Sequence, residues 1–306
     1  MKTANSADGY LLLHKNSGCT SFDALRDVKR ALGTGKIGHT GTLDKFAEGL
    51  LVVLVGKYTS LVPLFSDLDK VYTGLVRFGK ETDTLDPEGN ILREGPLPSF
   101  ETLQSVIPGF LGNQLQEPPA YSAIHIGGRR ASELSRSGKS VVMPQRPVTI
   151  YSLDVLRYDG ERALIRVHCS KGTYIRSLAR DIGRACGTYA FLEELYRESV
   201  GPFQDRDALR IGDGSEAADI RAALTPVRTE LFNSLGIPVV ALSEAQARYV
   251  AFGKPLEPLL TEVQSTKKVD GRNLIALCTK EGEPCALIER NMKGFQPGWK
   301  YRQVLV

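Results

Sequence analysis

The chain has 306 residues, 42% of them apolar and 24% charged, which excludes disorder and allows a catalytic body with a smaller appended domain. The 39 basic and 35 acidic side chains leave a formal charge of +4, which permits an anionic partner without demanding one. Five cysteines without a C-x-x-C pair, and four histidines without ligand spacing to them, argue against a metal site and favour a reducing compartment.

Membrane insertion and export are not indicated. The longest apolar run, residues 50–55, is far too short to cross a bilayer. Residues 1–10 contain a lysine and small polar side chains, and no apolar stretch of signal-peptide shape follows them. We therefore expect a cytoplasmic protein with no membrane partner, and we expect a monomer.

In chain order, the first predicted elements are a strand, a basic helix, and a loop that leads into a second strand. Residues 10–13 form the first strand, and Thr20 is placed to cap a helix that begins at Ser21. The apolar residues at helical spacing are Phe22, Leu25, Val28 and Leu32. Residues 33–41 contain four glycines and predict a loop, after which residues 50–55 predict a strand.

The middle of the chain combines strands, helices and one long insertion. The predicted strands are residues 70–78, 148–157 and 163–169, the predicted helices are residues 100–110 and 174–185, and residues 82–90 are rich in turn formers. Residues 116–147 are rich in proline, glycine, serine and arginine and exceed the length of an ordinary connection. Such an insertion is typically functional or mobile.

A domain boundary is predicted near Gly236, which divides the chain into residues 1–235 and 236–306. The second part has a strand-like segment at 239–242, a helix at 244–251, and several short strands separated by Gly and Asp turns. These patterns predict a small mixed or barrel-like module.

The segment Gly33-Thr34-Gly35-Lys36-Ile37-Gly38 matches the G-x-G-x-x-G pattern of dinucleotide-binding loops, but its context is wrong. It follows a predicted helix rather than a strand and opens no long helix, and residues 53–57 supply no acidic side chain for a ribose. It also lacks the Ser or Thr that a P-loop uses for magnesium. We therefore expect no nucleotide cofactor.

A second candidate follows at once in the segment G-H-T-G-T-L-D-K-F-A-E-G-L-L, residues 38–51, which places Asp44 between glycines on a loop before an apolar strand. An isolated aspartate there would be a turn residue. Four further segments change that interpretation by their order and spacing. They are Lys70-Val71-Tyr72 followed by the loop Thr82-Asp83-Thr84-Leu85-Asp86, then Gln116-Glu117-Pro118-Pro119-Ala120-Tyr121, and then Ser170-Lys171-Gly172-Thr173-Tyr174-Ile175-Arg176.

Together, these motifs resemble the TruB family of tRNA pseudouridine synthases over residues 10–203. The resemblance implies an α+β pseudouridine synthase fold, with a central mixed, mostly antiparallel sheet flanked by helices and loops. It also implies that residues 116–147 form a thumb-like RNA-binding insertion. The C-terminal module weakly resembles an RNA-binding PUA-like, β-rich domain.

The resemblance further implies the isomerisation of uridine to pseudouridine at position 55, in the T-arm of tRNA. That reaction breaks the bond between ribose C1′ and uracil N1 and rejoins the base through C5, so it needs no cofactor and no metal. Asp44 would be the nucleophile, and Arg176, in the first turn of a helix, would favour its charged form. Tyr72 would stack on uracil, with its hydroxyl available for removal of the C5 proton.

The remaining site residues implied by the resemblance bind the substrate. Leu195 would form an apolar pocket wall, His39 would lie near the flipped-out nucleotide, and Lys15 would brace the active-site loop. Tyr174 and Lys171 belong to the motif before the helix. Phosphate contacts are expected from Arg26, Lys29, Arg30, Arg129, Arg130, Arg136 and Lys139.

Several positions depart from the family pattern. Lys45 and Asn16 stand where prolines are usual, which leaves the rigidity of the Asp44 loop open, and His125 replaces a common lysine. Two alternatives also stay open. One is a catalytically silent module that binds or folds RNA, against which Asp44, Tyr72 and Arg176 argue, and the other is an enzyme of the same chemistry that acts on ribosomal RNA.

Overall fold

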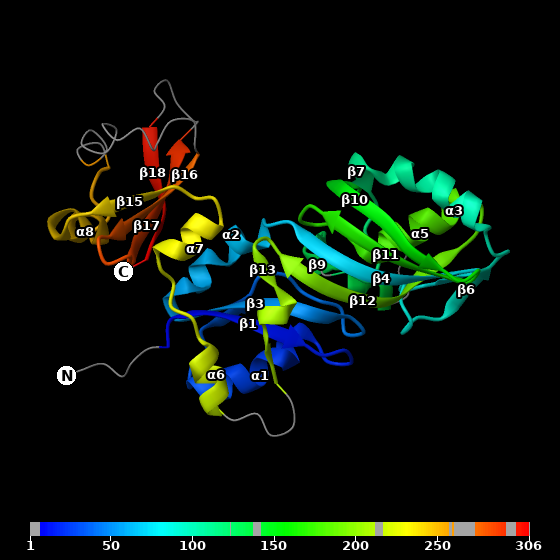
Figure 1. Cartoon of the computed structure of the whole chain (residues 1–306), viewed down its shortest axis with the longest axis horizontal. Coiled ribbons are helices and arrows are strands. Elements are labelled where there is room, and N and C mark those ends of the chain that lie inside the picture. The colour runs from blue at the N-terminus through cyan, green and yellow to red at the C-terminus, as the bar shows by residue number, and fades with distance from the viewer. Residues whose placement is uncertain are drawn as a thin grey trace.

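The computed structural model describes residues 7–122, 124–136, 142–211, 217–256, 259, 273–291 and 298–305. Two sheets lie along its long axis, a large one that carries most of the chain and a small one at the C-terminal end (Figure 1). The predicted residue Lys139 and the polar stretch 212–215 lie outside the described residues, as do the side chains of Arg130 and Arg136.

The large sheet has the strand order β14-β1-β3-β12-β4-β11-β10-β7, with β2 paired to β3 and β13 to β12. These strands are β1 (Gly9–Lys15), β2 (Ile37–His39), β3 (Glu48–Val55), β4 (Lys70–Phe78), β7 (Gly112–Gln116), β10 (Arg146–Tyr158), β11 (Arg162–Cys169), β12 (Ala190–Val200), β13 (Phe203–Gln204) and β14 (Leu209–Arg210). Only β1–β14 and β3–β12 pair in parallel among these described strands. The predicted mixed, mostly antiparallel sheet is therefore confirmed.

Side-chain alternation divides the sheet into two faces. Every second residue of β4 is buried, and these residues pack against α5 (Ile175–Ala185) in one apolar cluster with β11 and β12. The helix predicted at 174–185 thus forms, with Tyr174 as its N-terminal flanking residue. The other face of β4, which includes Thr73 and Arg77, bonds to charged side chains.

The central strand β12 was not predicted by the sequence patterns. Its pairing with β4 shifts register between Leu192 and Glu194 and again between Arg197 and Ser199, so the period-two alternation is interrupted twice. Its acidic side chains are also offset by arginines on neighbouring strands, as in the Arg77–Glu193 and Arg166–Glu198 pairs. A charged, bulged segment therefore occupies the middle of the sheet.

Helix α1 (Ser21–Leu32) covers β1 and β3 on one side of the sheet. Thr20 caps it as predicted, in a capping box with Asp23, and Leu25, Val28 and Ala31 bury against the strands. The glycine-rich loop before Gly41 contains the additional short strand β2. The pairing of β2 with β3 therefore attaches the loop after α1 to the sheet shortly before Asp44.

Short elements connect the main strands. They are η1 (Gly56–Leu61), α2 (Val62–Ser66), β5 (Lys80–Thr82), β6 (Ile91–Glu94), α3 (Phe100–Val106), η2 (Ile107–Phe110), η3 (Asp205–Asp207), α6 (Ala217–Ala223) and α7 (Thr229–Ser234). The helix predicted at 100–110 is divided into α3 and a 3-10 turn, because Pro108 cannot donate the hydrogen bond that would continue the α-helix.

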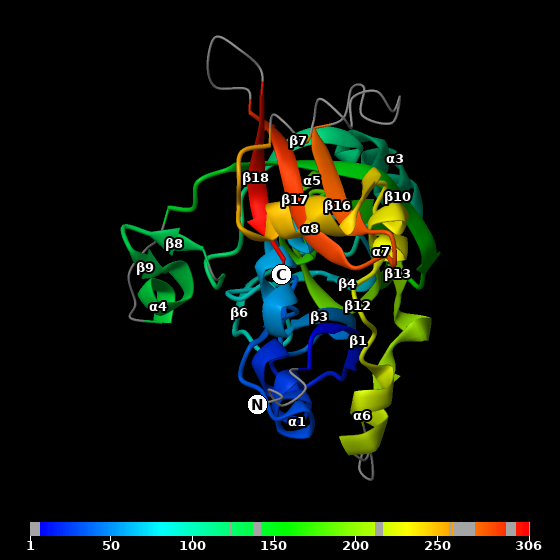
Figure 2. The same ribbon diagram turned by 90° about the vertical axis from the view of Figure 1, so that its left-hand side faces the viewer.

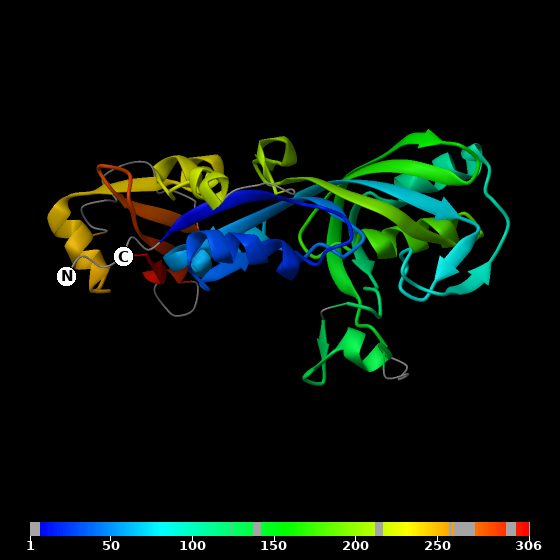
Figure 3. The ribbon, with the colours of Figure 1, turned by 90° about the horizontal axis from the view of Figure 1, so that it is seen from below.

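The insertion after β7 projects from the body as a separate arm, seen clearly in Figures 2 and 3. It contains the hairpin strands β8 (His125–Ile126) and β9 (Arg129–Arg130) and the helix α4 (Ala131–Arg136). Its small apolar cluster of Ile124, Ala131 and Met143 packs against Tyr174 at the start of α5. The arm is therefore attached where the predicted site helix begins.

The C-terminal sheet has the order β15-β16-β17-β18 and is packed by α8 (Glu244–Ala251). Its strands are β15 (Val239–Leu242), β16 (Leu274–Thr279), β17 (Pro284–Asn291) and β18 (Gly298–Val304). A second apolar cluster joins this sheet to the body, since Ala276 and Leu287 pack with Leu54 and Phe65. None of the helices in the described ranges is long and apolar enough to cross a membrane.

Candidate active site

A cavity of about 450 Å³ opens between the sheet, the start of α5 and the base of the arm. Five predicted site residues line it, namely Asp44, Tyr72, Tyr174, Arg176 and Leu195. They come from the loop before β3, from β4, from the beginning of α5 and from β12. The fold thus brings together segments that are up to 151 positions apart in the sequence, as between residues 44 and 195.

Asp44 and Arg176 form the central contact. Arg176 Nη2 donates a hydrogen bond to Asp44 Oδ1 at 3.1 Å, and Nε lies 2.8 Å from Oδ2 in ion-pair contact, without the angle of a hydrogen bond. The Arg176 side chain is 5% exposed whereas that of Asp44 is 36% exposed. A buried guanidinium therefore holds a carboxylate that still faces the cavity.

Arg176 is held in turn by the loop between β5 and β6. Its Nη1 donates to Thr84 O at 2.8 Å and to Asp86 Oδ2 at 3.1 Å, and Nη2 also donates to Tyr121 O. Burial raises the pKa of Asp86, against which the hydrogen bond from Thr84 and the charge of Arg176 act. The structure therefore turns Asp86 inward onto Arg176.

Lys15 contacts main-chain carbonyls around the loop that carries Asp44. It is 0% exposed, and its Nζ donates to Asn16 O at 3.0 Å, to Cys19 O at 2.8 Å and to Lys45 O at 3.4 Å. Burial lowers the pKa of Lys15, and the nearby Cys19 and Asp44 oppose that shift. Asn16 and Lys45 stand where prolines are usual, but the contacts of Lys15 with these carbonyls still fix the loop.

Ser21, the first residue of α1, fixes the same loop from its other side. The Ser21 hydroxyl donates to Leu43 O at 3.1 Å and accepts from Leu43 N at 2.9 Å. The residue just before Asp44 is therefore bonded through both of its main-chain groups. A helix start that the sequence predicts thus positions the predicted nucleophile.

Tyr72 and Leu195 form a wall of the cavity on neighbouring strands. Tyr72 is 8% exposed, and burial raises the pKa of its hydroxyl, which the charge of Arg197 opposes. Leu195 is also buried and lies opposite Gly74 of β4. The cavity therefore offers an aromatic and an aliphatic surface beside the carboxylate, as a pocket for a flipped-out nucleobase requires.

The other predicted site residues lie outside this lining. His39 is half-buried in β2 with its Nδ1 unbonded among the described residues, and burial lowers its pKa, as does the charge of Arg197. Lys171 is exposed and donates to Asp67 Oδ1 at 2.7 Å. Arg129 is exposed on the arm, and Arg130 follows it on β9.

Two further cavity residues, Lys70 and Arg197, were not predicted as site residues. Lys70 is 7% exposed and Arg197 is 2% exposed, and both line the cavity. Lys70 stands two residues before Tyr72, and Arg197 stands two residues after Leu195. The burial of Arg197 could not be inferred because β12 was not recognised as a strand, and that of Lys70 because a lysine is ordinarily solvated.

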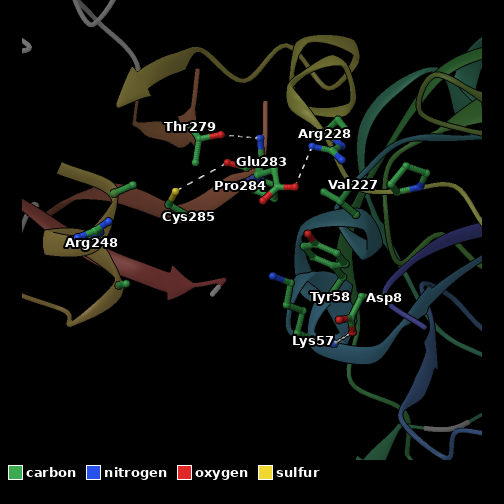
Figure 4. Close-up of a pocket in the computed structure, with 13 residues that line it drawn as sticks. Asp8, Lys57, Tyr58, Val227, Arg228, Arg248, Thr279, Glu283, Pro284 and Cys285 are labelled. Carbon is green, nitrogen blue, oxygen red and sulfur yellow. Dashed lines mark hydrogen bonds and ion pairs between the residues drawn. The ribbon is translucent and has the colours of Figure 1, made fainter. Parts of the chain in front are cut away.

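A second cavity, of about 430 Å³, lies between the body and the C-terminal sheet (Figure 4). Lys57 and Tyr58 face it from the body, and Glu283 faces it from β16–β17, where Arg228 Nη1 pairs with Glu283 Oε1 at 3.1 Å. None of the predicted site residues lines it. In the described part of the chain, no group of three or more His, Cys, Asp or Glu side chains is arranged to hold a metal.

Comparison with known proteins agrees with this geometry. A chain of a crystal structure of a Cbf5-Nop10-Gar1 complex superposes with a TM-score of 0.67 at 24% identity, covering 98% of this chain and 85% of that chain, which shows a common fold. Residues 29–175 match the model of the TruB family pseudouridylate synthase N-terminal domain. The fold is that of a pseudouridine synthase.

Sequence relatives place the chain more closely. It is 43% identical over 214 residues to the tRNA pseudouridine synthase B of Borreliella burgdorferi (strain ZS7), covering 69% of this chain and 76% of that protein. It is 36% identical over 296 residues to the protein of that name from Gluconacetobacter diazotrophicus, covering 92% and 96%. The chain belongs to the TruB family.

Proposed function

We propose that this protein is an isomerase, an intramolecular transferase that converts uridine to pseudouridine at position 55 in the T-arm of tRNA, without a cofactor. The observation that carries the proposal is the contact between Asp44 and Arg176, in which a buried arginine holds a partly exposed carboxylate beside an aromatic wall. The names of the sequence relatives supply the substrate class, tRNA.

The residues divide the chemistry as follows. A uridine that has swung out of the RNA enters the cavity, where Tyr72 and Leu195 pack on the base and Asp44 attacks the nucleotide. Attack of Asp44 at C1′ breaks the C1′–N1 bond and expels uracil as its anion. The base then turns, C5 attacks C1′ and expels the Asp44 carboxylate, and the C5 proton passes to water while N1 gains a proton. Because burial raises the pKa of Tyr72, its hydroxyl is protonated at rest, and we assign it stacking rather than the role of a resident base.

The RNA itself is held by the arm and the C-terminal part. Arg129 is exposed on the projecting hairpin, and Tyr121 and Ser132 of the same insertion line the cavity. We propose that residues 116–147 clamp the T-arm, that residues 1–235 are the catalytic domain, and that residues 236–306 are a PUA-like RNA-binding domain. We further propose that the protein is a cytoplasmic monomer.

The test is release of tritium from a T-arm hairpin that carries tritium at uridine C5. Wild-type protein should release the label to water with no additive, and a requirement for ATP, NAD or a metal ion would contradict the proposal. A ribosomal RNA hairpin serves as the second substrate, and preferred turnover of that RNA would reassign the target. If neither RNA releases label although both bind, the silent RNA-binding module is the correct function.

A further inference from the structure

Arg197 is a buried arginine with an unusual set of partners. Its Nε donates to Leu50 O at 2.7 Å and its Nη2 donates to Gly41 O at 3.1 Å, and both partners are neutral main-chain carbonyls. Its own main chain lies against Gly49, where a Cβ would approach Arg197 O to 2.5 Å at a φ of +110°. The sheet therefore fixes Arg197 firmly without neutralising it.

Lys70 repeats this arrangement nearby. Its Nζ donates to Ser66 O at 2.7 Å and to Leu68 O at 2.5 Å, again to neutral carbonyls. Within the described ranges, neither Lys70 nor Arg197 has a carboxylate at ion-pair distance. Burial lowers the pKa of Lys70 to about 8, and the charge of Arg197 contributes to that shift, as expected for neighbouring cations.

Both cations face the place where the base would lie. Arg197 is the direct cross-strand neighbour of Tyr72, and both residues line the cavity. The charged residues of the lining are Asp44, Lys70, Arg176 and Arg197. Since Arg176 is already shared between Asp44 and Asp86, the cavity holds two buried positive charges that have no acidic partner among the residues that the structure describes.

A buried cation without a counter-ion is costly, and it becomes favourable when negative charge develops beside it. When the C1′–N1 bond breaks, its electron pair goes to uracil N1 and is shared with the O2 and O4 atoms. We propose that Arg197, assisted by Lys70, stabilises this negative charge on the departing uracil until C5 bonds to C1′ and loses its proton. The inference rests on the proposed function and adds which residues stabilise the uracil anion during that reaction.

The experiment compares two T-arm hairpins, with uridine or 5-fluorouridine at the target position, in single-turnover reactions. Fluorine withdraws electrons and stabilises the uracil anion by itself, so a protein group that serves the anion matters less for that RNA. Arg197→Gln should slow the loss of N-linked uridine about 100-fold, but the loss of N-linked 5-fluorouridine only about tenfold. Hairpin affinity should stay within about twofold of wild type.

The controls separate this role from a purely structural one. Equal slowing on both RNAs would show that Arg197 only positions the Gly41 and Leu50 main chain, and it would overturn the inference, as would full activity on uridine. Arg197→Lys, which keeps the charge, should lie between wild type and Arg197→Gln, and it replaces that variant if glutamine prevents folding. A lysine variant as slow as the glutamine variant also counts against the charge.

A matched surface variant completes the comparison. Arg166 lies on β11 opposite Thr73, so it points to the other face of the sheet, where it pairs with Glu198 at 2.9 Å. Arg166→Gln should therefore leave both single-turnover rates within about twofold of wild type. Wild-type protein that converts neither RNA would refute the proposed function itself, which is a different outcome from any result for Arg197.

Discussion

Two clusters of charged side chains each centre on an aspartate that contacts an arginine, but the two clusters serve different purposes. The Asp44 cluster consists of Asp44, Arg176 and Asp86, and the Asp205 cluster consists of Asp205, His14, Tyr196 and Arg210. Asp205 is 1% exposed, and its oxygens accept from His14 Nδ1 at 2.8 Å, from the Tyr196 hydroxyl at 2.7 Å and from Arg210 at 2.9 Å.

The two clusters differ in how accessible the carboxylate is to a further partner. Asp205 is surrounded by donors on all sides, whereas Asp44 is 36% exposed and meets the guanidinium on one side only. Tyr196 and Arg197 are consecutive residues of β12, and they point to opposite faces, one to each region. A buried carboxylate whose oxygens are hydrogen-bonded, such as Asp205, stabilises the fold. A carboxylate that is exposed on one side, such as Asp44, is free to react.

The largest expected effects come from exchanging a carboxylate for an amide in each cluster. Asp44→Asn should reduce tritium release at least about 10⁴-fold, because the nucleophile is lost, while the free energy of unfolding changes by no more than about 1 kcal/mol. Asp205→Asn should instead keep kcat within about twofold and lower the free energy of unfolding by about 3 kcal/mol. Urea unfolding and the tritium assay on both variants test this; swapped effects would contradict the comparison.

Arg176→Lys should come next. A lysine is a point charge and cannot serve Asp44, Asp86 and two main-chain carbonyls together, so activity should fall about 10²- to 10³-fold and stability by about 2 kcal/mol. Arg180→Lys is the matched control, since Arg180 is buried one turn further along α5 and donates to Glu117 O and Asp181. That variant should lose less than about tenfold, and an equal loss would mean that any buried arginine of the helix is required.

Lys70 provides a third test, because it is a buried charge that belongs to neither cluster. Its pKa of about 8 lies below the ordinary 10.5, so the unfolded chain binds the proton more tightly between these values. Stability should therefore rise as the pH increases through this window and be lost as the pH falls toward 8. The stability of wild type relative to Lys70→Met should increase by about 2 kcal/mol from about pH 8 to 10. A constant difference would show that Lys70 is not titrating as a buried amine.

Local sequence signals predicted the frame of the molecule well. The capping box at Thr20, the helix at residues 244–251 and the paired strands of β10 and β11 all follow from patterns within one element. The strand β12 was not predicted because two register shifts interrupt its alternation. Its charged residues Glu193 and Glu198 pair with arginines of β4 and β11, which the sequence does not show. Its central place in the sheet is a tertiary property.

The same distinction applies to the site. Asp44 and Arg176 carry motif signals, and the structure brings their charged atoms to 2.8 Å. Lys70 and Arg197 carry no separate signal, because a lysine or arginine in a sequence is ordinarily solvated. Only the packed sheet shows that these two are buried, with no carboxylate partner in the described part of the chain. Asp86 has a motif signal, but its contact with Arg176 depends on how the loop folds back.

The smallest effect is expected one residue from the nucleophile. Lys45 Nζ pairs with Glu88 at 3.3 Å, with side-chain exposures of 54% and 49%, and such surface pairs contribute less than about 0.5 kcal/mol. What holds the loop there is the Lys45 carbonyl, which accepts from Gly18 N at 2.8 Å and from Lys15, and a change of side chain leaves it in place.

Lys45→Ala should therefore leave tritium release within about twofold of wild type, whereas Lys15→Met, which removes a buried donor from three carbonyls, should slow it more than about tenfold. Because both lysines contact the same loop, only their burial and their target atoms separate them. If the two variants were equally slow, the loop would depend on the exposed side chain, and its missing proline would be a real weakness rather than one compensated by main-chain hydrogen bonds.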